Sequence, residues 1–257
     1  MDNHKAIWDS FWRKYKFGVK EDEQIIRQES ASVRWNKIER RILNKYGSFK
    51  GLNVVEIGSG RGEVSAVMAT KGANITLIDY SEIALDKARV LFKNTGVEAN
   101  FLIADIRNFP KRLLNSFDIS MSFGLVEHFD YPLREDVVKL HTDLLKPNGI
   151  SFIGVPNVYC LPYRFFMKLS EILGYSSEGA EIPFSRSELR KIASSAGFKT
   201  YEIKGSSFIR DSVYFLFSRY ISHLTKWRLI IDISPFEISS IFDDYFGYSL
   251  VLIGTKS

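Results

Sequence analysis

The stretch Val54-Val-Glu-Ile-Gly-Ser-Gly-Arg-Gly62 joins a short apolar run to three glycines at alternate positions. An apolar run of this length is typical of a buried strand, and glycine lets the backbone turn tightly and approach a ligand. The residues that follow have a helical pattern as far as about Lys71, and Gly72 ends it. The stretch therefore predicts a strand, a glycine-rich turn and a helix, with a ligand site at the turn.

The same alternation of strand and helix continues along the chain. Further strands are predicted over residues 73–79, 97–104, 117–123, 149–155, 198–204 and 248–255, with helices beginning at Ser81, Pro132 and Ser185. Short links in such an alternation indicate parallel strands with helices on both faces. The last strand follows the sixth without a simple crossover, so we expect it to pair antiparallel at the edge. The predicted fold class is α/β, a three-layer, doubly wound, seven-stranded, mostly parallel sheet with an antiparallel last strand.

Composition and charge exclude several classes of protein. The chain has 257 residues, of which 45% are hydrophobic and one is a cysteine, and this excludes a disordered chain and a disulfide scaffold. No run reaches eighteen apolar residues and the start is polar, so we expect no transmembrane helix, no signal peptide and a cytoplasmic location. The net charge of +5 equals the excess of the first 50 residues and is weak support for a nucleic-acid partner.

Two carboxylates end consecutive strands beside the glycine turn. Asp79 comes 21 residues after Gly58, where an acid can accept the ribose hydroxyls of an adenosine ligand. Asp105 ends the next strand and is placed to meet an adenine amine. The glycine pattern is E-x-G-x-G-x-G, whereas dinucleotide sites favour G-x-G-x-x-G and hold a pyrophosphate. The pattern therefore suits an adenosine ligand without a pyrophosphate and disfavours a nicotinamide dehydrogenase.

Several motifs now resemble one family, the class I S-adenosylmethionine-dependent methyltransferases. Residues 54–62 are similar to their first motif, and the sequences around Asp79, Asp105 and Phe117 to His128 are similar to the next three. Leu144-Leu-Lys-Pro-Asn-Gly149 resembles the turn before strand five, with Asn148 where the family commonly has glycine. The resemblance covers about 200 residues. It implies the fold and S-adenosylmethionine as cofactor, and leaves the substrate undecided.

The resemblance also implies roles for single residues. Glu56 would support the glycine loop, Asp79 would hold the ribose, and Phe123 and Gly124 would border the reactive sulfonium, although core packing explains Phe123 equally well. The complete set implied to bind the cofactor is Glu56, Gly58, Ser59, Gly60, Asp79, Tyr80, Asp105, Ile106, Phe123 and Gly124. No metal is expected, because the sulfonium carries its own leaving group.

A helical stripe near the start resembles the lid that many of these enzymes place over the cofactor. Residues 3–17 carry Trp8, Trp12 and Tyr15 at helical spacing, and a basic helix is predicted over residues 22–46. An amphipathic helix that only docks on the domain fits the spacing as well. We expect one methyltransferase domain over residues 1–257, with a helical N-terminal lid (1–50), a cofactor-binding core (51–155), and substrate-covering helices with the last two strands (156–257).

His128 is the candidate general base. Its pKa lies near neutrality by residue type, and it follows the fourth strand, where an acceptor hydroxyl would lose its proton. The alternative is that Glu127 and His128 orient the cofactor or cap local structure. The predicted function is methyl transfer to a small-molecule acceptor by an O-methyltransferase of biosynthetic metabolism. A small-molecule N-methyltransferase and a non-catalytic S-adenosylmethionine-binding protein are the alternatives.

The substrate-facing parts leave further alternatives open. The basic face of residues 27–41 is a solvated helix face or a clamp for an anionic substrate group. The aromatic insertion over residues 205–246 forms an acceptor pocket, a dimer face or a membrane-surface patch. We expect a monomer or homodimer without a nucleic-acid partner, because the Asp/Asn-Pro-Pro-aromatic motif that base methyltransferases use is absent after the fourth strand.

Overall fold

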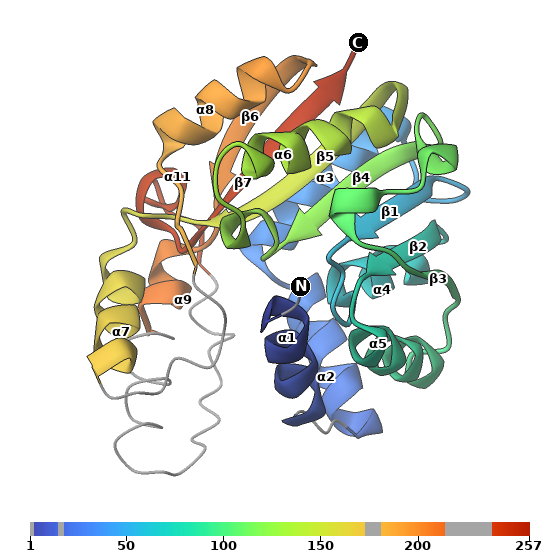
Figure 1. The fold of residues 1–257 in the computed structure, drawn as a ribbon, viewed down its shortest axis with the longest axis horizontal. Helices are drawn as coiled ribbons and strands as arrows, with labels where there is room; N and C mark the ends of the chain where they lie inside the picture. Colours follow the sequence, from blue (N-terminus) through green and yellow to red (C-terminus); the bar gives the residue numbers. More distant parts are fainter. Residues whose placement is uncertain (1–2, 15–17, 173–180, 214–237) are drawn as a thin grey trace.

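A seven-stranded sheet organises the computed structural model, which describes residues 3–14, 18–172, 181–213 and 238–257 (Figure 1). The strand order is β3-β2-β1-β4-β5-β7-β6, and β1 to β5 pair in parallel. The strands are β1 (Asn53–Ile57), β2 (Asn74–Asp79), β3 (Ala99–Ile103), β4 (Phe117–Phe123), β5 (Leu145–Pro156), β6 (Phe198–Gly205) and β7 (Ser249–Lys256). This confirms the predicted fold.

The position of β7 differs from the prediction in one respect. The strand is antiparallel to β5 and to β6, as expected, but it lies between them and not at the edge. Most residues of β7 are buried, including Leu250 and Leu252, whereas β6 has three consecutive exposed residues, at 199–201. The more apolar strand therefore takes the interior place, and the more polar strand takes the edge.

Helices cover both faces of the sheet. One face packs against α3 (Val33–Tyr46), α4 (Glu63–Thr70) and α5 (Glu82–Asn94), and the other against α6 (Leu133–Leu144) and α8 (Arg186–Ser195). Successive strand residues serve opposite faces, as Val54 and Val55 do. The predicted caps form, because the hydroxyls of Ser81 and Ser185 accept the backbone N–H of Ala84 and Glu188.

The N-terminal region contains a break that the sequence pattern did not predict. Residues 22–46 were expected as one helix, but the structure has α2 (Val19–Ser30) and α3, separated at Ala31 and Ser32. The hydroxyl of Ser32 accepts the backbone N–H of Trp35 at 2.9 Å, which starts a new helix. The break lets Trp35 reach the core while α1 (Asn3–Lys14) and α2 lie at the carboxyl edge of the sheet (Figure 1).

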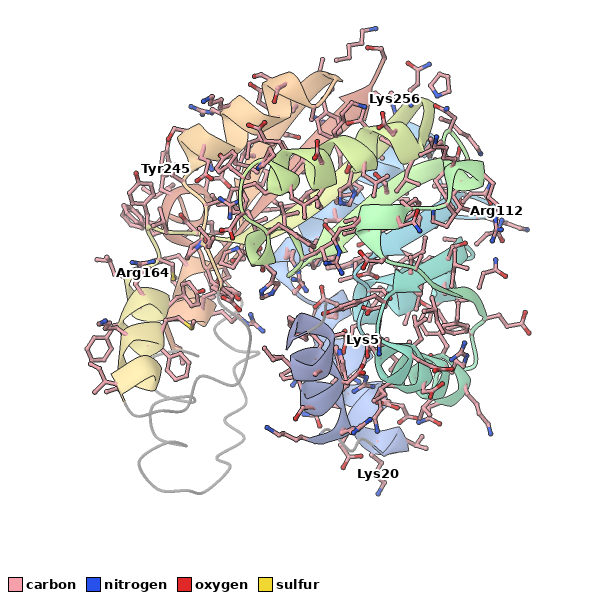
Figure 2. All side chains as sticks on the ribbon, in the orientation of Figure 1. Lys5, Lys20, Arg112, Arg164, Tyr245 and Lys256 are labelled. Atoms are coloured by element: carbon pink, nitrogen blue, oxygen red, sulfur yellow. The ribbon has the colours of Figure 1, made fainter. Side chains whose placement is uncertain are left out.

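Short helices gather at the end of the sheet formed by β6 and β7. These are α7 (Leu161–Ile172), α9 (Phe208–Val213) and α11 (Asp243–Phe246), and the side chain of Tyr245 lies exposed there (Figure 2). Part of the predicted aromatic insertion, residues 214–237, lies outside the described residues. Over the four described ranges, no helix has both the length and the apolar character that crossing a bilayer requires.

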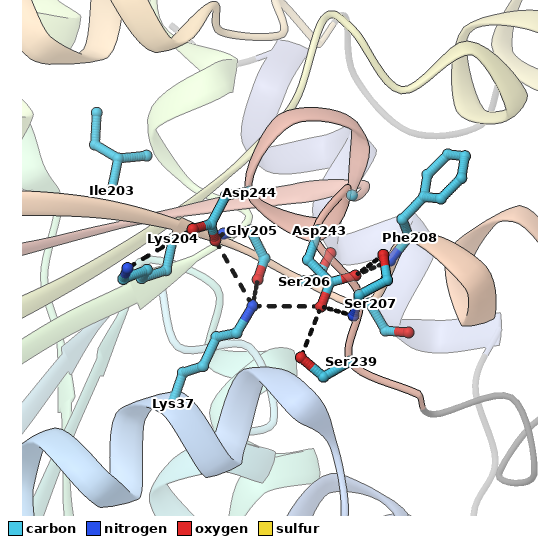
Figure 3. Close-up of polar contacts among 12 residues, drawn as sticks. Lys37, Ile203, Lys204, Gly205, Ser206, Ser207, Phe208, Ser239, Asp243 and Asp244 are labelled. Carbon is cyan, nitrogen blue, oxygen red and sulfur yellow. Dashed lines mark hydrogen bonds and ion pairs between the residues drawn. The ribbon is translucent and has the colours of Figure 1, made fainter.

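The basic face of the N-terminal helices contacts this same end. Lys37 Nζ donates to the carbonyl oxygen of Gly205 at 2.7 Å and lies 3.5 Å from an oxygen of Asp243 (Figure 3). Arg41 pairs with Glu202 at 2.7 Å, further along β6. Lys37 joins α3 to the start and end of the insertion, and Arg41 joins α3 to β6, so both cations have a structural use.

Candidate active site

A cavity of about 590 Å³ opens at the carboxyl ends of β1 to β4. Its wall combines the glycine turn after β1, the residues that end β2, β3 and β4, and aromatic side chains of α1. Carboxyl ends of parallel strands meet at one edge of a sheet, so residues distant in sequence converge there. The predicted residues that line this cavity are Trp8, Trp12, Gly58, Ser59, Gly60, Asp79, Tyr80, Asp105, Ile106, Phe123, Gly124 and His128.

The glycine turn needs glycine for two reasons at Gly60. The residue has φ of 52°, a left-handed conformation, and a Cβ there would lie 2.7 Å from Cζ2 of Trp12. Its backbone N–H donates to Oδ2 of Asp79 at 2.9 Å. The turn, the end of β2 and the helix α1 are therefore in direct contact.

Asp79 is held rigidly by backbone donors. Besides Gly60, the backbone N–H of Ser81 donates to Oδ1 at 2.9 Å, and the side chain is 6% exposed. Burial raises the pKa of this carboxyl. Each carboxylate oxygen keeps a second lone pair, so Asp79 retains the capacity to accept ligand hydroxyls.

Asp105 has a partner that the sequence analysis did not identify. The guanidinium of Arg107 donates to both carboxylate oxygens, with Nε at 2.9 and 3.0 Å. The hydrogen bond from Arg107 holds the pKa of Asp105 below its usual range. Arg107 also lines the cavity, so the β3 end presents an ion pair to a ligand.

The residues after β4 contact α1, the candidate lid helix. Phe123 ends the strand, Gly124 follows it, and η3 (Val126–His128) begins two residues later. The ring of His128 lies edge-on to Trp8, with 5.1 Å between the ring centroids. The candidate base and the candidate lid are therefore in contact across the cavity.

Two predicted residues stand apart. Glu56 does not line the cavity, because its carboxylate points into the base of α4 and accepts the hydroxyl of Ser65 at 2.5 Å. Burial raises the pKa of Glu56 to about 8. A support for the loop fits this position, whereas direct contact with the ligand does not. Tyr15 lies outside the described residues.

Comparison with known proteins places the chain in a family. The family model of the methyltransferase domain matches residues 54–149. A ubiquinone biosynthesis O-methyltransferase of Aromatoleum aromaticum is 31% identical over 170 residues, which cover 65% of this chain and 72% of the relative. A protein with the same name from Paraburkholderia phymatum is 29% identical, with 67% and 75% covered.

The chain belongs to the class I S-adenosylmethionine-dependent methyltransferases.

Solved structures agree with this methyltransferase in fold. The magnesium protoporphyrin IX methyltransferase of Synechocystis PCC 6803, with bound SAH, has a TM-score of 0.59 at 17% identity, and the match covers 97% of this chain and 94% of that chain. The same protein with bound SAM has a TM-score of 0.57. The predictions of an enzyme, of this family and of S-adenosylmethionine as methyl donor are confirmed.

The cavity of the methyltransferase fits this donor. The hydroxyl of Ser59 is buried in the glycine turn and has no hydrogen-bond partner in the protein, so a polar ligand group would satisfy it. The turn itself exposes backbone where a side chain at Gly60 would fill the space. The lining combines charged groups, backbone of the glycine turn and aromatic rings, which suits a ligand with a nucleoside and an amino-acid part.

Several lining residues were not among the predicted site residues. Phe11 adds a third ring to the lid stripe at helical spacing, so the pattern contained this signal. Arg107 lies two residues after Asp105 and could have been found as its partner. Glu181 and Tyr248 come from distant parts of the chain, and only the fold brings them to the cavity.

Proposed function

We propose that this methyltransferase moves a methyl group onto an oxygen of a small-molecule acceptor in biosynthetic metabolism. The observation that carries the proposal is one cavity shared by the glycine turn and His128, an imidazole able to take a hydroxyl proton. The named relatives, which are O-methyltransferases, support the choice of oxygen. A small-molecule acceptor, in place of a nucleic acid, suits a lined cavity better than an open groove.

The β1 to β3 side would hold the adenosine and methionine parts of the donor. Asp79 would accept the ribose hydroxyls, and Tyr80 and Ile106 would flank the adenine. The backbone of the turn would line the methionine part, and Ser59 would gain a partner there. When bound, S-adenosylmethionine supplies a methyl group on a positively charged sulfur that leaves as a neutral thioether.

The β4 side would hold the reacting centre. Phe123 and Gly124 would border the sulfonium, and His128 would accept the proton of an acceptor hydroxyl as its oxygen takes the methyl group. No further chemistry is required of the protein, because an in-line displacement depends mainly on alignment. If His128 orients the donor instead, no base in the protein would take the acceptor's proton. The rate would then depend on the pKa of the acceptor itself.

The helix α1 would close the site. Trp8 and Trp12 line the cavity from this helix, and Trp12 packs over Gly60. Such a lid excludes water and completes the site once the donor is bound. We further propose that residues 1–257 act as one methyltransferase domain with the lid, core and cover regions given above. Cytoplasmic location, a monomer or homodimer, and the absence of a nucleic-acid partner stay predictions.

A methyl-transfer assay with labelled S-adenosylmethionine tests the proposal. Phenols, alcohols and amines would be offered, S-adenosylhomocysteine release measured, and the methylated atom located by mass spectrometry and NMR. We expect oxygen methylation, and His128→Asn should lower kcat by about 10²-fold or more while the affinity for S-adenosylhomocysteine stays within about twofold. Methylation of nitrogen alone, or binding of the donor without turnover of any acceptor, would contradict it.

A further inference from the structure

Two carboxyl side chains line the end of the cavity beyond β4. Glu127 lies in η3, and Glu181 lies in the segment before α8. The backbone N–H of Ile182 donates to the carbonyl oxygen of Glu127 at 2.9 Å, which holds the two segments together. Because β5 and β7 follow β4 in the sheet, this end is opposite the side that holds Asp79 and Asp105.

Glu127 is buried and lacks a full set of partners. Its side chain is 2% exposed, lines the cavity, and its Oε2 has no hydrogen-bond partner in the protein. A buried polar atom without a partner costs about 1–3 kcal/mol. Burial raises the pKa of Glu127 to about 8, and the neighbouring Glu181 contributes in the same direction.

Glu181 accepts a hydrogen bond from a tyrosine in the same wall. The hydroxyl of Tyr163 donates to its Oε2, and Tyr163 packs against Tyr248 with 4.9 Å between the ring centroids. Burial raises the pKa of Glu181 as well. The tyrosine pair thus gives this end of the cavity an aromatic wall beside two carboxyls.

The nearby cation is engaged elsewhere. Arg134 donates to the carboxylate of Glu188 at 2.5 Å and to the carbonyl oxygens of Phe129 and Ile182 at 3.0 Å. It therefore builds the wall without forming a hydrogen bond to either cavity carboxyl. In the described part of the chain, no group of three or more acidic, histidine or cysteine side chains is arranged to hold a metal ion.

We propose that Glu127 and Glu181 recognise the methyl acceptor directly through its O–H or N–H donors. The acceptor class is then a neutral or cationic molecule with at least two donors near the reacting atom. Above about pH 8, where Glu127 is ionised, an acceptor with a carboxylate, sulfate or phosphate at that place is disfavoured, because the buried carboxylate repels it. The proposal rests on the proposed function, because it takes this end of the cavity as the acceptor site.

Calorimetry at about pH 9, where Glu127 is ionised, tests this recognition on the full chain loaded with S-adenosylhomocysteine and offered three aromatic probes. Catechol has two adjacent hydroxyls, phenol has one, and 2-hydroxybenzoate replaces one with a carboxylate. We expect catechol to bind about tenfold or more tighter than either of the others. Glu127→Gln and Glu181→Gln should each shrink the preference for catechol, and the double variant should lose most of the discrimination against 2-hydroxybenzoate.

The control is Glu98→Gln, an equally sized change at an exposed carboxyl outside the cavity. It should keep the wild-type preferences, and all variants should keep the wild-type affinity for S-adenosylhomocysteine. Equal binding of the three probes, no binding of any, or unchanged preferences in both variants would overturn the proposal. So would catechol binding that requires Mg²⁺ and disappears with a chelator, because the carboxyls would then hold a cation. If S-adenosylhomocysteine itself fails to bind the wild type, the proposed function fails instead.

Discussion

The β2–β3 end of the cavity holds Asp79 and Asp105, whose oxygens accept hydrogen bonds from this chain, whereas the β4–β7 end holds Glu127, whose Oε2 accepts none. The first two are fixed by neighbours in sequence or by the adjoining turn. Glu127 depends on a segment more than fifty residues away for its surroundings. We therefore expect Asp79 and Asp105 to be positioned before the donor binds, whereas Glu127 would gain a partner for its Oε2 only from a ligand.

The largest expected effect concerns the rigidity of the donor side. Arg61 of the glycine turn pairs with Asp22 of α2, and both side chains are at most 2% exposed. Arg61→Ala should lower the free energy of unfolding by about 3–5 kcal/mol, because it leaves a buried carboxylate without its cation. Urea denaturation measures it. Asp86→Ala removes an exposed pair with Arg89 and should change stability by less than about 1 kcal/mol. Equal losses in the two variants would remove the contrast in rigidity.

The next largest effect is a difference in S-adenosylhomocysteine affinity between variants at the β2–β3 end and at the β4 end of the cavity. Asp79→Asn should weaken binding of S-adenosylhomocysteine about 10- to 100-fold, since a charge-assisted hydrogen bond is worth about 1.5–3 kcal/mol. Calorimetry measures it, and Glu127→Gln should leave this affinity unchanged. Asp118→Asn, at the opposite end of the sheet beside Lys146, serves as the matched control. A large loss in Glu127→Gln would mean that both ends serve the donor.

The pH dependence of stability tests whether the carboxyl of Glu127 is buried without a hydrogen-bond partner for its Oε2. Its pKa rises from 4.5 to about 8 by burial, so between these values the folded protein keeps a proton that the unfolded chain releases. The free energy of unfolding should therefore fall as pH rises through this window, by at most about 1.4 kcal/mol per pH unit for one group.

Denaturation between pH 5 and 8 checks this slope. Glu127→Gln should flatten it, and so should Glu56→Gln, whose carboxyl has a similarly raised pKa. A bound acceptor should alter only the contribution of Glu127, because Glu56 does not line the cavity. A slope in Glu127→Gln equal to that of the wild type would show that this carboxyl is not isolated.

The smallest expected effect concerns the contact that joins the lid to the β4 end. Trp8→Ala removes an edge-on ring contact with His128, and aromatic pairs contribute about 0.5–1.5 kcal/mol. We expect kcat/KM to fall up to about tenfold, with most of the change in kcat if the contact positions His128. Leu161→Ala, at an exposed position of α7, is the control. A change confined to the KM of the donor would place Trp8 with the donor side.

Local signals explain what could be predicted from the sequence. The strands, the cap at Ser81 and the glycine turn depend on neighbouring residues, and they were predicted correctly. Asp79 and Asp105 could be placed together because parallel strands end at one edge. The break at Ser32, the interior position of β7 and the approach of Glu181 to Glu127 depend on packing between distant segments. No hydrophobic pattern in the sequence indicates contacts between distant segments. These features could therefore be found only in the structure.

The interior position of β7 also affects how the chain acquires its structure during synthesis. Residues 249–256 come after β6 in the chain, yet they form the strand that joins β6 to β5. Until those residues leave the ribosome, the edge of β5 presents unpaired backbone groups and β6 has no neighbour in the sheet. An unpaired apolar strand edge can pair with another chain. The seventh strand therefore covers the edge of β5 and gives β6 its neighbour, which keeps both strands from pairing with another chain.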